Sequence, residues 1–145
     1  MSYTGPLEER IRIRELVETY GDAVARGDPE AWALCWDIDG KWEIFGQTLV
    51  GRANIVQFWT SIMDQFEFAG FNTALGAIEV TGQRAMVRAY TAEELFLSDG
   101  SVRRIRGRYD DQVIKQDGQW VFGCRSYTVL HDRSDPTAGS NCADG

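Results

Sequence analysis

Two adjacent glutamates interrupt an apolar run that is otherwise typical of a β-strand. The run is AYTAEELFL, and its carboxylates belong to Glu93 and Glu94. Because successive side chains in a strand point to opposite faces of a sheet, one carboxylate must face the core if the sheet has one buried face. A buried carboxylate either finds a cationic partner or acquires a raised pKa, which suits it to proton transfer. The pair therefore contains a candidate general acid or base.

Four strand-like runs fill the second half of the chain, and short connections separate them. The connections contain TGQ, SDG and QDGQ, each with a glycine that suits a tight hairpin. Because no helical stretch lies between the runs, we expect them to pair as an antiparallel meander. The runs lie near residues 71–80, 84–97, 101–115 and 119–131.

Alternation in the two middle runs places Glu93 on the buried face. In the run 101–115 one face carries three arginines and cannot form a core, so Tyr109 and Asp111 on the opposite face must point inward. If the run 84–97 pairs with the run 101–115 so that both bury their apolar faces on the same side, Glu93 points inward and Glu94 points outward. An alternative for Glu93 is a solvated strand end, where it pairs with an arginine. The outward face, typical of a ladder of solvated ion pairs, carries Arg88, Arg104, Arg106 and Arg108.

The same alternation predicts the inner face of the last run. Trp120, Phe122, Cys124 and Ser126 fall on one face, which we assign to the core. Tyr127 then falls on the outer face with the arginines.

Helices are expected in the first half of the chain. A helix from Leu7 to Arg26 carries one apolar stripe that includes Tyr20, and Gly27 ends it. A short helix over 29–36 and a third over about 53–66 follow. Helices followed by a sheet predict an α+β domain.

Composition narrows the class of partner. The chain has 145 residues and a formal net charge of −7, without the basic patch of a nucleic-acid-binding protein. One histidine, His131, and three scattered cysteines provide neither a zinc site nor a disulfide framework. With no apolar segment long enough for a membrane span, we expect a cytoplasmic protein without metal or cofactor. We assign residues 1–131 to a single domain and 132–145 to a flexible tail.

Four segments in the same order resemble the SnoaL-like group of the nuclear-transport-factor-2-like superfamily. They are ELVETYGDAVARGDPEAW, CWDIDGKWEIFG, GRANIVQFW and GRYDDQVIKQDGQWVFGCRSYT. The resemblance covers about residues 7–131. It implies a cone-shaped α+β barrel, in which a curved, mostly antiparallel sheet wraps around the long first helix and an apolar pocket. It also implies a homodimer.

The resemblance extends to individual residues. Tyr20 resembles the oxyanion-hole tyrosine of steroid isomerases, and Glu93 resembles the catalytic strand aspartate of bile-acid dehydratases. The oxyanion-hole aspartate of the isomerases corresponds to Asp110 or Asp111, between which alternation favours Asp111 and the hairpin count favours Asp110. Tyr20 also suits a purely structural place in the core.

Other family positions differ. The base of the isomerases corresponds to Ile44, and the histidine of the dehydratases has no counterpart in the segment GFNTALGAI. The resemblance therefore implies proton-transfer chemistry of the isomerase, dehydratase or cyclase type, but without the usual Asp–His pair. A non-catalytic binding domain and an assembly subunit, like the β subunit of ring-hydroxylating dioxygenases, are the alternatives. The expected ligand is a small hydrophobic cyclic or aromatic molecule, in a pocket lined by Trp42, Phe58, Trp59, Thr73, Thr91, Tyr109, Phe122 and Ser126.

Overall fold

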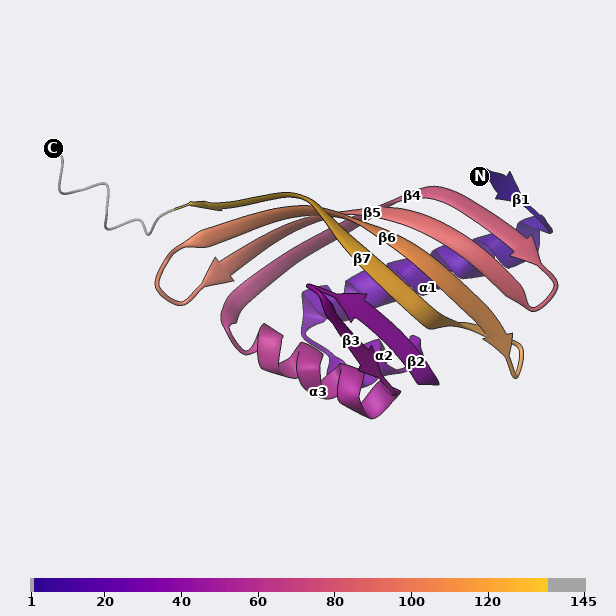
Figure 1. Cartoon of the computed structure of the whole chain (residues 1–145), viewed down its shortest axis with the longest axis horizontal. Coiled ribbons are helices and arrows are strands. Elements are labelled where there is room, and N and C mark those ends of the chain that lie inside the picture. The colour runs from indigo at the N-terminus through magenta and orange to yellow at the C-terminus, as the bar shows by residue number, and fades with distance from the viewer. Residues whose placement is uncertain (1, 136–145) are drawn as a thin grey trace, which may run out of the picture.

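A seven-stranded mixed sheet curves over the first helix in the computed structural model, which describes residues 2–135 (Figure 1). The strand order is β1-β4-β5-β6-β7-β2-β3. The predicted α+β class and the predicted antiparallel meander, β4 to β7, are confirmed. The outer elements add parallel pairings, since β1 runs parallel to β4 and β2 runs parallel to β7. The strands are β1 (Tyr3–Thr4), β2 (Trp36–Ile44), β3 (Gln47–Val50), β4 (Phe66–Thr81), β5 (Arg84–Leu97), β6 (Val102–Gln116) and β7 (Gln119–Asp135).

The helices follow their sequence signals closely. Helix α1 (Leu7–Arg26) ends at Gly27, whose left-handed φ of 61° terminates the helix as predicted. The Asp28 side chain caps α2 (Pro29–Ala33) by accepting a hydrogen bond from the Ala31 amide at 3.0 Å. Both α2 and α3 (Arg52–Met63) end earlier than predicted, because Trp36 begins β2 and Phe66 begins β4.

The last strand is longer than the sequence suggested. Strand β7 continues to Asp135 and pairs with the start of β6. Residues 132–135 therefore belong to the sheet, which corrects the predicted start of a flexible tail. The rest of that predicted tail lies outside the described residues.

The concave side of the sheet contains the core. In Figure 1 the long strands β4 to β7 arch over α1, while α2, α3, β2 and β3 lie on the same concave side. Aromatic side chains fill the space between these layers, and the rings of Trp32 and Trp59 stack at 4.5 Å between centroids. Since each buried aromatic residue removes a large apolar area from water, this cluster is a major source of stability. No helix within residues 2–135 is long and apolar enough to span a membrane.

A β-bulge at Gly123 changes which residues of β7 face the core. Val113 pairs with Phe122, but the preceding residue Gln112 pairs with Cys124, so Gly123 is the extra residue on β7. Alternation therefore restarts one residue out of phase after Gly123. The predictions that Cys124 and Ser126 point inward and that Tyr127 points outward are wrong.

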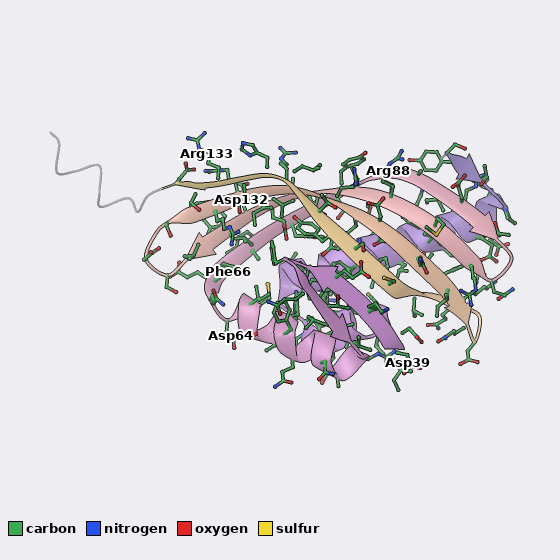
Figure 2. The ribbon with its side chains drawn as sticks, viewed as in Figure 1. Asp39, Asp64, Phe66, Arg88, Asp132 and Arg133 are labelled. Atoms are coloured by element: carbon green, nitrogen blue, oxygen red, sulfur yellow. The ribbon has the colours of Figure 1, made fainter. Side chains whose placement is uncertain are left out.

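The convex side carries the charged ladder that the sequence predicted. Glu94 accepts a hydrogen bond from Arg104 at 3.2 Å, and Asp110 accepts one from Arg108 at 3.0 Å. Figure 2 shows Arg88 and Arg133 projecting from this side of the sheet. These pairs are largely exposed, so each contributes ~1 kcal/mol or less to stability.

Candidate functional site

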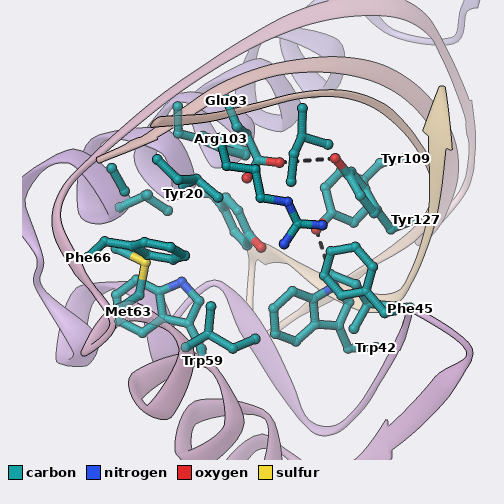
Figure 3. Close-up of a pocket in the computed structure, with 17 residues that line it drawn as sticks. Tyr20, Trp42, Phe45, Trp59, Met63, Phe66, Glu93, Arg103, Tyr109 and Tyr127 are labelled. Atoms are coloured by element: carbon teal, nitrogen blue, oxygen red, sulfur yellow. Dashed lines mark hydrogen bonds between the residues drawn. The ribbon is translucent and has the colours of Figure 1, made fainter. Parts of the chain in front are cut away.

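A cavity of about 90 Å³ lies between α1, α3, β2 and the concave face of the sheet (Figure 3). This volume exceeds the ~15 Å³ that one water molecule requires and is smaller than the ~150 Å³ of an engineered cavity that takes up benzene. A ligand with one ring therefore fits only if part of it lies at the mouth or a lining side chain moves. Most of the lining is aromatic or aliphatic, and its polar side chains are Tyr20, Glu93, Arg103, Tyr109 and Tyr127.

Within residues 2–135, Glu93 is the only carboxylate that lines the cavity. Strand β5 places it between Phe71 on β4 and Ile105 on β6, and the Tyr127 hydroxyl donates a hydrogen bond to its Oε2 at 3.0 Å. No cationic group within residues 2–135 lies close enough to form an ion pair with it. Burial raises the pKa of the Glu93 carboxyl, while the hydrogen bond from Tyr127 and the charges of Arg103 and Arg125 oppose this rise. Such a carboxyl can exchange a proton with a ligand closer to neutral pH than an exposed glutamate can.

Tyr127 reaches Glu93 by crossing an intervening strand. It starts on β7, while Glu93 is on β5, and Gly107 lies on β6 between them. A Cβ atom at Gly107 would overlap with the ring and hydroxyl of Tyr127. The absence of a side chain at Gly107 therefore allows this hydrogen bond. Thr91 lies beside the same hydroxyl, with 3.4 Å between the two oxygens.

Two further tyrosines supply hydroxyl groups to the deep part of the site. Trp42 donates a hydrogen bond from Nε1 to the Tyr109 hydroxyl at 3.2 Å, which leaves the phenolic proton of Tyr109 available to another acceptor. Burial raises the pKa of Tyr20 to about 12, and Arg125 opposes the rise. Both phenols are therefore neutral hydrogen-bond donors at pH 7.

A buried ion pair lies behind these tyrosines. Arg125 donates to both carboxylate oxygens of Asp111, from Nε at 2.8 Å and from Nη2 at 3.1 Å. The Arg125 guanidinium carbon lies 3.7 Å from the centre of the Tyr109 ring and 4.5 Å from that of Tyr20. The positive charge of Arg125 is attracted to the electron-rich faces of the two tyrosine rings, which is a cation–π interaction. The same charge lies close to the tyrosine hydroxyl groups.

The structure corrects the role predicted for the two aspartates. Asp111 points inward as predicted, but it does not line the cavity, and Arg125 occupies both of its oxygens. Burial raises the pKa of Asp111, and the adjacent guanidinium opposes that rise. Asp111 is therefore not a hydrogen-bond donor to a ligand. Asp110 lies on the outer face with Arg108, so the alternative assignment is also wrong.

The predicted pocket residues separate into two groups. Trp42, Trp59 and Tyr109 line the cavity, together with Tyr20 and Glu93. Phe58 lies one layer behind, where its ring packs edge-on against Trp42 at 5.8 Å. Ser126 is on the opposite side of the sheet, and its hydroxyl donates to Glu43. The predicted residues that do not line the cavity are Phe58, Thr73, Thr91, Phe122 and Ser126.

Sequence reasoning missed two polar residues of the site, Arg103 and Tyr127. Arg103 shares the inner face of β6 with Ile105 and Tyr109, so extending the alternation by two residues would have found it. Tyr127 required recognition of the bulge, for which an isolated glycine inside a strand, Gly123, is the usual sequence signal.

Metal and thiol chemistry find little support in residues 2–135. No three histidine, cysteine or acidic side chains in this range form a group that could hold a metal ion. Cys35 is buried, and burial raises its pKa to about 11, so it is not a nucleophile at neutral pH. His131 lies opposite Arg106 in the pairing of β7 with β6 and does not line the cavity. Cys142 lies outside the described residues.

The sequence from residue 5 to 126 matches the SnoaL-like domain family. The chain belongs to this family. In this SnoaL-like protein the curved sheet and α1 border the cavity described above. No curated protein sequence matches the chain.

Solved structures share the fold over nearly the whole chain. A candidate scytalone dehydratase from Novosphingobium aromaticivorans is 21% identical, with a TM-score of 0.81, and the match covers 92% of this chain and 95% of that one. A type 3 hexachlorocyclohexane dehydrochlorinase from Novosphingobium barchaimii is 18% identical, with a TM-score of 0.77, and the match covers 89% and 91%. A candidate dehydratase of the NTF2-like family from Streptomyces avermitilis is 16% identical, with a TM-score of 0.77, and the match covers 87% and 99%. At these identities the likeness shows the fold and leaves the activity to be argued from the site.

Proposed function

We propose that this SnoaL-like protein is a lyase or isomerase that acts on a small hydrophobic cyclic or aromatic molecule by proton transfer, without a cofactor. The observation that carries the proposal is the Glu93 carboxyl, which faces an aromatic cavity, forms no ion pair within residues 2–135 and is held by the Tyr127 hydroxyl at 3.0 Å. A glutamate in that environment is a general acid or base.

Four polar side chains of the cavity, Glu93, Tyr127, Tyr20 and Tyr109, have a place in this chemistry. The ionised form of Glu93 removes a proton from a carbon next to a carbonyl group, and Tyr127 fixes the carboxyl in position. As negative charge develops on the carbonyl oxygen, the phenolic protons of Tyr20 and Tyr109 stabilise it by hydrogen bonding. Tyr109 is suited to this because its oxygen already accepts a hydrogen bond from Trp42, so its hydroxyl acts as a donor.

The structural relatives support the reaction class. They include proteins named as dehydratases and a dehydrochlorinase, which eliminate water or hydrogen chloride from their substrates. Elimination and isomerisation share one elementary step, the removal of a proton from carbon. In our proposal Glu93 performs that step.

Proton exchange at carbon tests the proposal without knowledge of the natural substrate. Cyclic ketones such as 2-tetralone and 3-oxocyclohexanecarboxylate would be incubated with the protein in D₂O, and loss of the α-proton signal would be followed by NMR. We expect the wild-type protein to accelerate exchange and Glu93→Gln to slow it by about 10²- to 10⁴-fold. The matched control is Glu94→Gln, the neighbouring carboxylate on the outer face, which should exchange like the wild type. Unchanged exchange in Glu93→Gln would show that another group is the base.

A non-catalytic binding domain is the second candidate. It is favoured by the cavity lining described within residues 2–135, which holds one carboxylate and no histidine and so lacks the Asp–His pair usual in the dehydratases. Ligand binding without any exchange in the same assay would support it.

An assembly role and a homodimer remain predictions. We propose the outer face of the sheet as the surface for assembly; it excludes Tyr127, which faces the cavity, and includes Arg88, Arg106 and Arg108 together with exposed Tyr90. Sedimentation of the purified chain would measure the oligomeric state.

A further inference from the structure

We propose that Arg103 binds a carboxylate at the mouth of the cavity, so that the ligands of this protein are small cyclic or aromatic carboxylic acids in their anionic form. This deepens the proposed function by naming its substrate class. It rests on the same cavity, but the binding of a carboxylate does not require Glu93 to move a proton.

Arg103 lies where the cavity opens to solvent. Strand β6 turns it inward beside Leu95 of β5, and its side chain is 40% exposed. Phe45, the other strongly exposed residue of the lining, lies opposite it, with 6.0 Å between the guanidinium carbon and the ring centre. Figure 3 shows the Arg103 guanidinium reaching into the space enclosed by Tyr20, Phe45, Tyr109 and Tyr127.

One edge of the Arg103 guanidinium is already fixed. Asp132 of β7 accepts from Nε at 3.1 Å and from Nη2 at 2.7 Å. This two-point contact sets the plane of the guanidinium, and Arg103 in turn lowers the pKa of Asp132. Asp132 therefore remains ionised and holds Arg103 in place at neutral pH.

The other edge of the guanidinium is free. Within residues 2–135 no group accepts a hydrogen bond from Nη1, so the edge formed by Nη1 and the second N–H of Nη2 has no protein partner. A guanidinium edge presents two parallel N–H groups whose spacing matches the two oxygens of a carboxylate. Glu93 lines the same cavity but does not reach this edge to form an ion pair. The gap between these two groups is therefore open to a ligand.

The apolar walls beside Arg103 suit the rest of such a ligand. Phe45 has a φ of 50° and Gly46 a φ of 73°, so they form the two-residue turn between β2 and β3 with a phenylalanine in the left-handed region. That conformation is unfavourable for a bulky residue and is often retained at functional sites. Here it places an aromatic ring at the mouth, where it can pack against the ring of a bound acid whose carboxylate lies on Arg103.

The negative charge of the whole chain does not oppose this assignment. The net charge of −7 is spread over the surface, and salt at physiological strength screens charges beyond ~8 Å. A ligand at the mouth responds mainly to the charges beside it. These are Arg103, Asp132 and Glu93, with Arg125 deeper behind the tyrosines.

Paired probes that differ only in charge provide the test. Benzoate and benzamide, and cyclohexanecarboxylate and cyclohexanecarboxamide, would be titrated into the protein while the fluorescence of the cavity tryptophans is followed. We expect the wild type to bind each carboxylate at least about tenfold more tightly than its amide, as hydrogen bonds to a charged partner allow. In Arg103→Met the preference should fall to within about twofold. Equal binding of acid and amide by the wild type, an unchanged preference in Arg103→Met, or no binding of any probe would overturn the proposal.

Two control variants separate recognition from structure. Arg104→Met removes the neighbouring arginine, which lies on the outer face with Glu94, and should keep the full preference. Asp132→Asn leaves the charge of Arg103 in place but weakens the two-point contact that orients its guanidinium. The preference for the carboxylate should therefore fall only in part. If Arg103→Met fails to fold, as judged by circular dichroism, Arg103→Lys replaces it. A lysine keeps the charge without the two-point edge, and an undiminished preference in that variant would contradict recognition by the guanidinium edge.

The outcome is independent of the proposed reaction. Glu93→Gln removes a carboxyl group beside the ligand, so it should keep or strengthen the carboxylate preference even though it loses proton exchange. If Glu93→Gln exchanges protons normally while Arg103→Met loses the preference, the reaction assignment fails and the ligand class stands. If the reverse is found, the ligand class fails and the reaction assignment stands.

Discussion

Two of the arginine–aspartate pairs that connect β6 and β7 form two-point contacts, and they differ almost entirely in their access to water. Arg125 and Asp111 are 1% and 0% exposed in the interior, whereas Arg103 and Asp132 are 40% and 36% exposed at the mouth of the cavity. Both pairs are two-point contacts with similar distances. The comparison shows that location, rather than the residue types, decides whether such a pair is structural or available to a ligand.

The surroundings explain this difference. The buried pair is enclosed by the rings of Tyr20, Tyr109 and Phe122, so Arg125 has no room for another partner. Separation of the two charges there would leave an uncompensated ion in an apolar medium. At the mouth, water solvates both charges, and Arg103 can take up a second acceptor at little cost.

Removal of the arginine from each pair should produce the largest contrast. We expect Arg125→Met to lower the free energy of unfolding by about 3–5 kcal/mol, because Asp111 is left buried without its partner. Arg103→Met should lower it by about 1 kcal/mol or less, because both partners are solvated. Urea unfolding of the two variants measures the difference. Equal losses would mean that the pair at the mouth is also structural.

Alanine at Gly107 should have the next largest effect. A new Cβ overlaps with Tyr127, so we expect Gly107→Ala to lower the free energy of unfolding by about 1–3 kcal/mol and to break the contact with Glu93. Proton exchange should fall with it. In a Tyr127→Ala background the same substitution should cost much less, since the overlapping ring is absent. A full loss of stability in that background would place the strain elsewhere.

The turn at the mouth offers a smaller change. Asn tolerates the left-handed conformation better than Phe, so Phe45→Asn should raise the free energy of unfolding by up to about 1 kcal/mol. The same variant should bind benzoate more weakly, because the aromatic wall beside Arg103 is removed. Thermal unfolding and the fluorescence titration measure the two effects. A clear loss of stability would show that the Phe45 ring stabilises the fold by packing.

The pH dependence of stability should show the smallest effect, which comes from Glu93. Its folded-state pKa is raised by burial above the value of 4.5 for a free glutamate, so the folded protein binds this proton more tightly than the unfolded chain. Stability from this group therefore falls as pH rises from 4.5 through the folded-state pKa. Glu93→Gln should become progressively more stable than the wild type over that range, while Glu94→Gln should not. A pH-independent difference between Glu93→Gln and the wild type would mean that the pKa of Glu93 is not raised.

The sequence predicted most of the fold because its signals are local. The apolar period of α1, the glycine that ends it and the hairpin glycines between the long strands all act within a few residues. Alternation in β5 and β6 correctly turned Glu93 inward and Glu94 outward. The parallel pairing of β2 with β7 and the continuation of β7 to Asp135 were not evident, since both depend on partners far away along the chain.

By itself, the sequence determined that one of two adjacent carboxylates faces the buried side of the sheet, because strand side chains alternate, and the pattern of the next strand favoured Glu93. Only the tertiary structure decided what surrounds it. The bulge at Gly123 shifts β7 by one residue, which brings Tyr127 onto Glu93 and Arg125 onto Asp111 and moves Ser126 out of the site. Such a shift is set by hydrogen bonding between strands, which a local pattern of residues does not specify.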